Sequence, residues 1–311
     1  MTPPRLATER IVAAVDFSDD WENMVAHAAH LARLRGSGGA PGSVHLVHVI
    51  QPPNWLMGQV LGTHDLEAHQ QELEESASRR LDAVVNNLGE LEARASVMTG
   101  KPSVETLAAI ERDEAGVLVL GMAEPTGTSL GSNADRLFRV SPVPVYAVGP
   151  RPPEEIRSVL VPTALGPGGA TAISVALDLV APGGTVYPLY MAALPAVMRG
   201  WQGNVMELRQ QMTHRAEEEL RRHVASIPVP EGKHVEPILR TNLEQVTAER
   251  TIVKEARERG VQLICLALGG RELPPGMLIG RVSEKVIRSL PCSLLALPDA
   301  WVDAVTRESD A

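Results

Sequence analysis

The chain has 311 residues, of which 44% are hydrophobic and 22% are charged, and its formal net charge is −9. This composition is typical of a globular protein long enough for two domains, and the acidic balance argues against a general nucleic-acid-binding or anionic-membrane surface. No basic stretch leads into an apolar run near the start, and the longest apolar runs are too short to cross a bilayer. The two cysteines, Cys265 and Cys292, lie inside apolar runs and are interpreted as buried thiols. We therefore expect a cytoplasmic protein with no membrane or nucleic-acid partner.

The predicted elements follow the same order twice along the chain. In each half a β-branched run is followed by an apolar-periodic helix, a second strand, a loop with a tryptophan and a long charged helix. The first half places these elements at 10–18, 22–34, 43–50, Trp55 and 66–88. The second half places them at 157–165, 170–180, 184–191, Trp201 and 205–227. Each half closes with two more strands, at 115–121 and 141–148 in the first half and at 261–269 and 290–297 in the second.

Strands that alternate with helices predict βαβ units, which require right-handed crossovers and a parallel sheet. The fold class is therefore α/β, with two tandem doubly wound domains of five parallel strands each. Proline and charge replace the apolar periodicity at 149–158, which predicts domains at 1–150 and 151–311. Pro144 lies inside the last strand of the first half and suits a sheet edge. Because an apolar edge invites pairing, the strands at 143–148 and 293–297 are expected to meet each other, as a pseudo-dimer, or to form a homo-dimer.

Five pieces of the first half together resemble the universal stress protein domain. They are "VAAVDFS" with Asp16, "HLVHV", "VLVLG" with Gly121, a glycine loop with a Gly-Ser step, and "PVPVYAV". Because the order recurs in the second half, the whole chain resembles the tandem form of this family. The resemblance implies a Rossmann-like, adenine nucleotide α-hydrolase-like fold and a non-catalytic role in the stress response.

In the members of this family that bind ATP, the resemblance implies a pocket at the first-half positions Asp16, Val49, Gly121, Gly131 and Ser132. Asp16 and Val49 would line the adenosine, and the glycine loop would wrap the phosphates. No cofactor is required for the role that the resemblance implies.

The glycine loop departs from the family pattern in length and in residue type. Glu124 and Pro125 stand where a glycine and free backbone are expected, the loop is three residues shorter, and Gly127 supplies a glycine only in a different register. A shorter loop has less backbone to surround a polyphosphate, and a Glu124 that pointed inward would repel a γ-phosphate, whereas one that pointed to solvent would not. We therefore expect weak ATP binding at most, with AMP or adenosine as the ligand that domain 1 accommodates better.

The second half lacks both polar anchors of this pocket. Thr163 stands where the first half has Asp16, and Arg281 stands where it has Ser132. A cation at a helix N-terminus lies at the unfavourable end of the helix dipole. The second half is therefore expected to be a degenerate copy without nucleotide.

Two of the candidate residues also have explanations that need no ligand. Ser132, followed three residues later by Asp135, is close to a capping box, and Asp16 could end one strand and cap the next helix. Among the nine histidines, His27 and His30 share a helix face, whereas His45 and His48 point to opposite faces of a strand. Since no cysteine or regularly spaced carboxylate accompanies them, no metal site is expected.

No sequence motif supplies a nucleophile together with its base, so we expect no enzymatic activity. Dinucleotide and P-loop glycine motifs and the Gly-x-Ser-x-Gly elbow are all absent. The alternative is a slow ATP-hydrolysing or adenylate-handling enzyme of the same superfamily. Such an enzyme needs cations and a Mg²⁺ carboxylate around the phosphates, and the first half offers only Arg136 and Arg139 after the loop.

Overall fold

The computed structural model describes residues 6–34, 41–52, 63–122, 132–192, 205–241, 247–269 and 280–310. The chain divides into two compact units, Ala7–Glu154, called domain 1, and a second unit that contains Glu155–Ala311, called domain 2. In the described part of the chain, the helices are too short or too polar to span a membrane.

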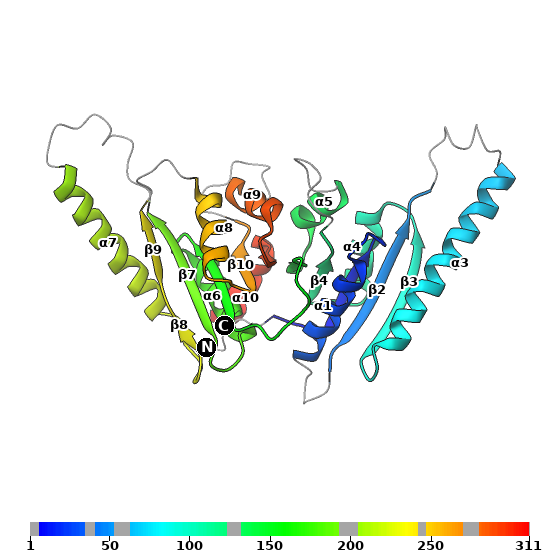
Figure 1. The fold of residues 1–311 in the computed structure, drawn as a ribbon, viewed down its shortest axis with the longest axis horizontal. Coiled ribbons are helices and arrows are strands. Elements are labelled where there is room, and N and C mark those ends of the chain that lie inside the picture. The colour runs from blue at the N-terminus through cyan, green and yellow to red at the C-terminus, as the bar shows by residue number, and fades with distance from the viewer. Residues whose placement is uncertain are drawn as a thin grey trace. The chain divides into compact units, whose positions relative to one another are not determined.

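Domain 1 is a parallel α/β unit (Figure 1). Its elements are β1 (Arg10–Val15), α1 (Trp21–Leu34), β2 (Ser43–Ile50), α3 (Thr63–Asn87), β3 (Glu92–Thr99), α4 (Pro102–Arg112), β4 (Val117–Leu120), α5 (Ser132–Val140) and β5 (Val145–Ala147). The strand order is β3-β2-β1-β4-β5, and every pair is parallel. The sheet therefore grows outward from β1 in both directions, as in other doubly wound folds.

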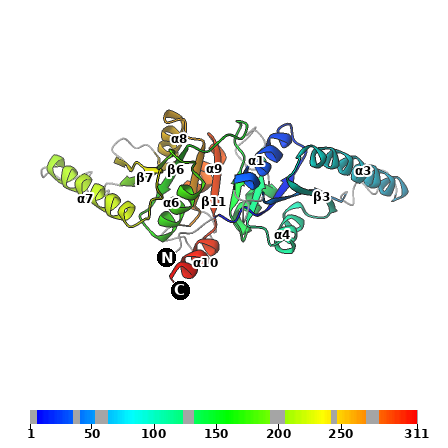
Figure 2. The same cartoon turned by 90° about the horizontal axis from the view of Figure 1, so that it is seen from below.

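The helices of domain 1 cover both faces of its sheet. Figure 2 shows α1 and α3 on one side of the strands and α4 on the other, as right-handed crossovers require. β4 is a continuous apolar run that is buried throughout, as is typical of a central parallel strand. β3 is the end strand, and most of its residues are half-buried or exposed. The face of β3 that is turned toward the α4 side is therefore only partly covered.

Domain 2 repeats this architecture with one interrupted strand. Its elements are β6 (Ser158–Thr163), α6 (Pro167–Leu179), β7 (Thr185–Ala192), α7 (Val205–Ala225), β8 (His234–Val235), β9 (Ile238–Thr241), α8 (Ala248–Glu258), β10 (Leu263–Ala267), α9 (Arg281–Ser289), β11 (Ser293–Leu297) and α10 (Asp299–Asp310). The parallel order is β7-β6-β10-β11, with β8 and β9 both paired to β7. Pro237 lies between β8 and β9 and has no N–H to donate, which explains the break.

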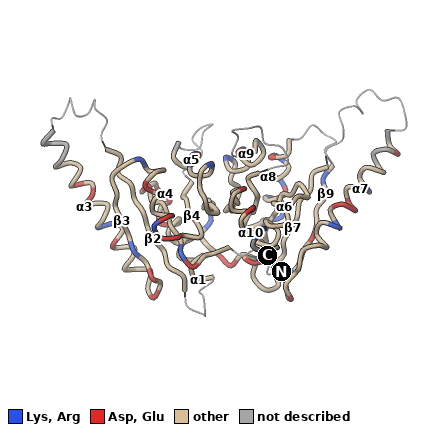
Figure 3. The backbone as a smooth tube through the Cα atoms, turned by 180° about the vertical axis from the view of Figure 1, so that it is seen from behind, with Lys and Arg blue, Asp and Glu red and all other residues tan. Residues whose placement is uncertain are grey.

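The structure confirms the predicted fold class, an α/β Rossmann-like architecture that occurs twice. The long charged helices also form as predicted, and Figure 3 shows acidic and basic positions distributed along α7. Pairs such as Arg215 with Glu219, 3.3 Å apart, join successive turns of α7 on its solvated surface. Helix α10, which follows the last strand, was not predicted. Its first residue, Asp299, accepts a hydrogen bond from the Gly269 amide.

Candidate functional site

The carboxyl ends of β2, β1 and β4 bring three of the predicted site residues together in domain 1. Asp16 follows β1, Val49 is the penultimate residue of β2, and Gly121 follows β4. These strands are neighbours and parallel, with Val15 opposite His48 and Ala14 opposite Leu120. The three residues therefore lie side by side at the sheet edge where doubly wound folds bind ligands.

The other three predicted site residues belong to the glycine loop. Gly127 and Gly131 lie outside the described residues, as do Glu124 and Pro125. Ser132 is the first residue of α5, but its side chain also lies outside the described part of the structure. Its phosphate contact and its capping role both stay predictions. Asp135, the other half of the predicted capping box, accepts hydrogen bonds of 2.9 and 3.2 Å from Arg139 within α5.

Asp16 forms a tight turn with Ser18 directly after β1. Its Oδ1 accepts hydrogen bonds from the Ser18 amide at 3.0 Å and from the Ser18 hydroxyl at 2.6 Å, which is an Asx turn. The Asp16 side chain is exposed. Among the described residues, no hydrogen-bond donor reaches Oδ2 of Asp16. The Asp16 side chain thus bonds to Ser18 and not to the first turn of α1, which begins at Trp21, so the predicted helix-capping role is not the one observed. Its role toward a ligand stays a prediction.

A cluster of rings and a cation surrounds this turn. Phe17 has a φ of 56°, which a bulky L-residue rarely adopts. Its ring lies 4.5 Å from that of His48 and 5.1 Å from that of Trp21, and the Arg80 guanidinium lies 4.0 Å above it. His48 donates from Nδ1 to the Val15 carbonyl at 2.8 Å. These contacts hold the strained turn in place, as is common at functional sites.

Sequence reasoning missed this ring cluster because its members come from four separate segments. Only the alternation along β2 gave a signal, since it placed His45 and His48 on opposite faces. The structure agrees with that placement: His48 contacts the turn before α1, whereas His45 contacts Asp113 at the end of α4.

The corresponding edge of domain 2 is filled by the protein itself. Thr163 forms the same turn as Asp16, since its Oγ1 accepts a 3.0 Å hydrogen bond from the Leu165 amide, but Thr163 is only 8% exposed. Its hydroxyl occupies the space that any side chain at Gly169 would take. At the next strand end, the Asp299 carboxylate accepts a hydrogen bond from the Gly269 amide and fills the space beside it. A negative charge thus already lies where an anion would have to bind.

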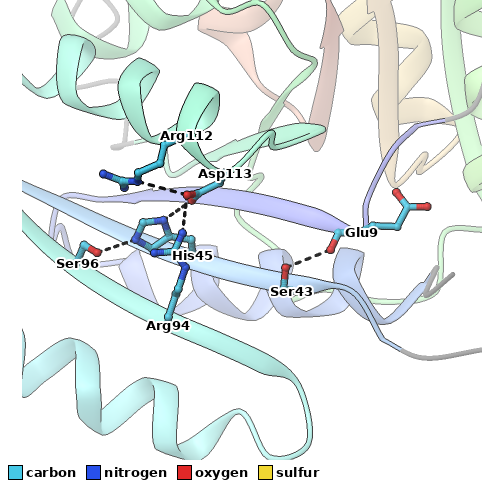
Figure 4. Close-up of polar contacts among 7 residues, drawn as sticks. All are labelled: Glu9, Ser43, His45, Arg94, Ser96, Arg112 and Asp113. Carbon is cyan, nitrogen blue, oxygen red and sulfur yellow. Dashed lines mark hydrogen bonds and ion pairs between the residues drawn. The ribbon is translucent and has the colours of Figure 1, made fainter.

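A second group of polar side chains lies at the opposite end of the domain 1 sheet (Figure 4). His45 Nδ1 lies 2.5 Å from Asp113 Oδ2, and His45 Nε2 lies 2.8 Å from Ser96 Oγ. Asp113 Oδ1 also accepts from Arg94 at 2.5 Å and lies 3.5 Å from Arg112 Nε. The side chains of His45 and Asp113 are only 4% and 9% exposed, whereas Arg94 and Arg112 are more than half exposed.

Burial and charge shift the pKa values of this group. Burial lowers the pKa of His45 below its ordinary value, and the hydrogen bond with Asp113 offsets this only in part. Burial acts to raise the pKa of Asp113, but the hydrogen bond from His45 and the charge of Arg94 outweigh it and hold that pKa below its usual range. At neutral pH the pair is therefore a neutral imidazole beside a carboxylate.

Because the pKa of His45 is lowered in the folded protein, we expect domain 1 to lose stability as the pH falls below about 6.5, the ordinary pKa of histidine. The folded state binds a proton at His45 less readily than the unfolded chain does, so the stability present above that pH is lost as the pH falls through the folded pKa. Asp113 adds a further loss at lower pH, with the same sign. We expect His45→Asn, which removes the titration, to make the decline between about pH 7.5 and about pH 5 shallower.

The measurement is hydrogen exchange of domain 1 amides across this pH range, corrected for the intrinsic exchange rate. His27, also in domain 1, has a pKa lowered by burial as well, so part of the decline remains in the variant. His214→Asn is the matched control, because the His214 side chain is 68% exposed. A decline equally steep in His45→Asn and wild type would show that His45 does not bind its proton as the geometry implies.

Of the histidine pair on α1, His27 and His30, His27 forms contacts with the end of domain 1. His27 Nε2 donates to the Arg151 carbonyl at 2.9 Å, and its Nδ1 lies 3.3 Å from the Tyr146 hydroxyl. In the described ranges, no three His, Cys, Asp or Glu side chains gather as metal ligands would. His27 thus stabilises the end of domain 1.

Comparisons with known proteins agree with this architecture. A structure of a universal stress protein from Archaeoglobus fulgidus DSM 4304 is 17% identical, with a TM-score of 0.63, covering 94% of this chain and 99% of that one. A functionally unknown protein from Pseudomonas aeruginosa PAO1 is 16% identical, with a TM-score of 0.62 and 98% of each chain covered. At these identities the likeness establishes the fold alone. No curated protein matches the chain.

The model of the Universal stress protein family matches residues 7–149 and again 155–298. The chain therefore belongs to the universal stress protein family and carries two of its domains in tandem.

Proposed function

We propose that this protein is a cytoplasmic universal stress protein that acts by binding, and that domain 1 binds a small adenosine ligand such as AMP. The ligand would lie at the carboxyl ends of β1, β2 and β4, against Asp16, Val49 and Gly121. Domain 2 serves as a nucleotide-free structural partner. Two buried cysteines that form no disulfide, Cys265 and Cys292, suit the reducing compartment that this proposal names.

The observation that carries the proposal is the contrast between Asp16 and Thr163. Asp16 directly follows β1 and Thr163 is the last residue of β6, and each accepts a hydrogen bond of 3.0 Å from the amide two residues later. Asp16 is exposed and offers a second carboxylate oxygen, whereas Thr163 is buried and packed against Gly169. An ionised carboxylate accepts strong hydrogen bonds, such as those a ribose hydroxyl or an exocyclic amine donates.

Steric space at Gly121 also favours domain 1. Among the described residues, a Cβ placed on Gly121 would meet only Met24, at an ordinary contact distance of 3.6 Å, whereas the space beside Gly269 holds the Asp299 carboxylate. Burial and the neighbouring Asp303 raise the pKa of Asp299, yet its hydrogen bond from the Gly269 amide keeps that donor occupied. In the described part of the chain, an anionic ligand would meet no side-chain carboxylate beside Gly121, whereas it would meet the competing Asp299 carboxylate beside Gly269.

The shortened loop makes AMP or adenosine a better ligand than ATP in this proposal. Three missing residues and the side chains of Glu124 and Pro125 leave less backbone for a β- or γ-phosphate. We also keep the expectation that the last strand of each domain pairs within the chain or with a second copy, because apolar sheet edges are rarely left open.

Calorimetric titration of the intact protein tests the proposal. We expect AMP to bind one site per chain more tightly than ATP, and Asp16→Ala to weaken AMP binding by about tenfold or more, which corresponds to about 1.4 kcal/mol. Asp16→Asn keeps an acceptor for the Ser18 amide but not the charge, so it separates the turn role from the ligand role. Thr163→Ala is the matched control in domain 2 and should leave affinity unchanged.

Three results would contradict the proposal. Micromolar ATP affinity, about −8 kcal/mol on the standard scale, would show that the loop deletion has little effect. Affinity that Asp16→Ala does not change would place the ligand elsewhere. Affinity that Thr163→Ala abolishes would move the site to domain 2. Ser132→Ala completes the series, because a loss of AMP affinity without a loss of stability would favour phosphate contact over capping.

A further inference from the structure

We propose that Ser96, His45 and Asp113 form a nucleophilic site in domain 1 that hydrolyses small carboxylic esters carrying a negatively charged acyl group. This site lies at the opposite end of the sheet from Asp16 and does not depend on nucleotide binding. It revises the expectation from the sequence that the chain contains no nucleophile with its base.

The three side chains have the geometry and the exposure that such a site requires. Ser96 Oγ lies 2.8 Å from His45 Nε2, and His45 Nδ1 lies 2.5 Å from Asp113 Oδ2, both within the reach expected of a nucleophile, its base and the group that orients the base. Ser96 is half-buried on the end strand, while His45 and Asp113 lie buried behind it. Ser96 is thus the most exposed of the three residues, and Figure 4 shows its side chain beside the His45 ring.

The hydrogen bonds assign the proton positions in the neutral imidazole. A carboxylate can only accept, so the proton on His45 lies on Nδ1 and is donated to Asp113. Nε2 is therefore the lone-pair nitrogen, and the Ser96 hydroxyl donates to it. This is the tautomer in which His45 can remove the hydroxyl proton from Ser96.

The open edge of β3 supplies a donor for the developing oxyanion. The Gly100 amide donates to Ile50 of β2, so even-numbered residues of β3 direct their N–H groups to β2 and odd-numbered residues direct theirs outward. Val97, the residue after Ser96, therefore presents its N–H at the outer edge, where no other described strand pairs with β3. A backbone N–H next to the nucleophile is a usual oxyanion donor.

Two half-exposed cations favour an anionic acyl group. Arg94 lies two residues before Ser96 on the same strand face, and its side chain is 57% exposed; the Arg112 side chain is 53% exposed. Each contacts the same carboxylate of Asp113, so the group carries a net positive charge when His45 is neutral. A carboxylate on the acyl chain would find a cation within reach of the ester carbonyl.

Domain 2 shows that the fold does not need these three residues. His45 pairs with Val12, the third residue of β1. In domain 2 the third residue of β6 is Leu160, and it pairs with Tyr187. Ser96 pairs with Val47, the fifth residue of β2. The fifth residue of β7, Leu189, pairs with Ile238, which is therefore the counterpart of Ser96. Asp113 follows α4 as its C-cap, where α8 has Arg259. The Arg259 guanidinium lies 4.9 Å above the Tyr187 ring. The same framework thus forms with a ring and a cation, and domain 1 alone carries the Ser-His-Asp set.

The reaction balances with water as the only co-reactant. Ser96 Oγ attacks the ester carbonyl while its proton moves to His45 Nε2, and the Oγ–C bond forms. The tetrahedral oxyanion is held by the Val97 N–H. The C–O bond to the leaving alcohol then breaks, and the alcohol takes the proton from Nε2. Water attacks the acyl-Ser96 carbonyl, gives a proton to Nε2, and releases the carboxylic acid as Oγ regains that proton.

Labelling of the intact protein with a fluorophosphonate probe, followed by peptide mass spectrometry, tests the assignment of the nucleophile. We expect a single adduct on Ser96 that is lost in Ser96→Ala and in His45→Asn, which keeps a donor to Asp113 but offers no base. Ser43→Ala is the matched control, because Ser43 lies on the neighbouring strand β2 and donates only to the Glu9 carbonyl at 3.3 Å. Circular dichroism establishes that each variant is folded.

Hydrolysis of 4-nitrophenyl hemisuccinate and 4-nitrophenyl acetate tests the activity and the substrate class. We expect a faster rate with the hemisuccinate, lowered about 100-fold or to the rate without enzyme by Ser96→Ala and by His45→Asn, and unchanged by Ser43→Ala. Wild-type protein that gains no adduct on Ser96, or a rate that folded Ser96→Ala retains, would overturn the proposal. Equal rates with the two esters would overturn the assignment of an anionic substrate.

Discussion

Asp113→Ala is expected to lower the free energy of unfolding of domain 1 by about 3 kcal/mol. The substitution leaves the Nδ1–H of His45, whose side chain is 4% exposed, without its acceptor and removes the bonds from Arg94 and Arg112. The loss of the bond to His45 dominates, because the two arginines are more than half exposed and can be hydrated. Asp113→Asn, which keeps one acceptor oxygen, should cost less.

Native-state hydrogen exchange with mass spectrometry measures this effect within each domain separately. Amides of β2, β3 and α4 should lose protection in Asp113→Ala, whereas amides of domain 2 serve as the internal reference. Glu114→Gln is the matched control on the neighbouring residue, since its ion pair with Arg10 joins side chains that are 75% and 54% exposed. That control should shift stability by less than about 0.5 kcal/mol. Equal effects of the two substitutions would mean that the buried network contributes nothing beyond a surface pair.

Glu255→Ala is expected to destabilise domain 2 by a similar amount, about 3 kcal/mol. Glu255 lies on α8, is 4% exposed, and accepts from Arg240 through both oxygens at 2.7 and 3.0 Å and from Arg259 at 3.3 Å. A paired fork of this kind joins β9 to α8 with defined geometry. Its removal takes from Arg259, which is stacked on Tyr187, the counter-charge that Glu255 supplies.

Chemical denaturation followed by exchange of the β7 and α8 amides measures the loss. Glu258→Ala is the control on the same helix, because Glu258 and Lys254 are both more than half exposed and their charged atoms are 3.8 Å apart. A surface pair of this kind contributes about 0.5 kcal/mol or less. If Glu255→Ala cost no more than Glu258→Ala, the buried fork would have no net role in holding β9.

The sequence predicted the strands and helices that carry strong hydrophobic periodicity. The runs at 10–18 and 157–165 became β1 and β6, and the repeat gave the tandem α/β architecture. The segments that sequence reasoning left unassigned have weaker patterns. β3 has the sequence "EARASVMT", which mixes polar and apolar residues because this end strand is only partly buried. β8 and β9 are short and are separated by Pro237. Helix α10 follows the last strand, beyond the repeated unit.

The candidate sites depend on residues that only the pairing of strands brings together. Asp16, Val49 and Gly121 could be named from the end of each strand, because parallel strands direct their carboxyl ends to one edge. Ser96 and Asp113 could not, since they lie in an unassigned strand and at the end of an unassigned helix. A Ser-His-Asp arrangement is defined by geometry and not by spacing in sequence, so a motif search could not find it.

The most direct test of the proposed function is a crystal structure of the intact protein grown with AMP. We predict AMP in domain 1 only, with its adenosine at the carboxyl ends of β1 and β2 and the Asp16 carboxylate within hydrogen-bond distance of it, and no nucleotide beside Thr163. AMP bound at Thr163 and Gly269 in domain 2, or a domain 1 edge that stays empty at saturating AMP, would contradict the account.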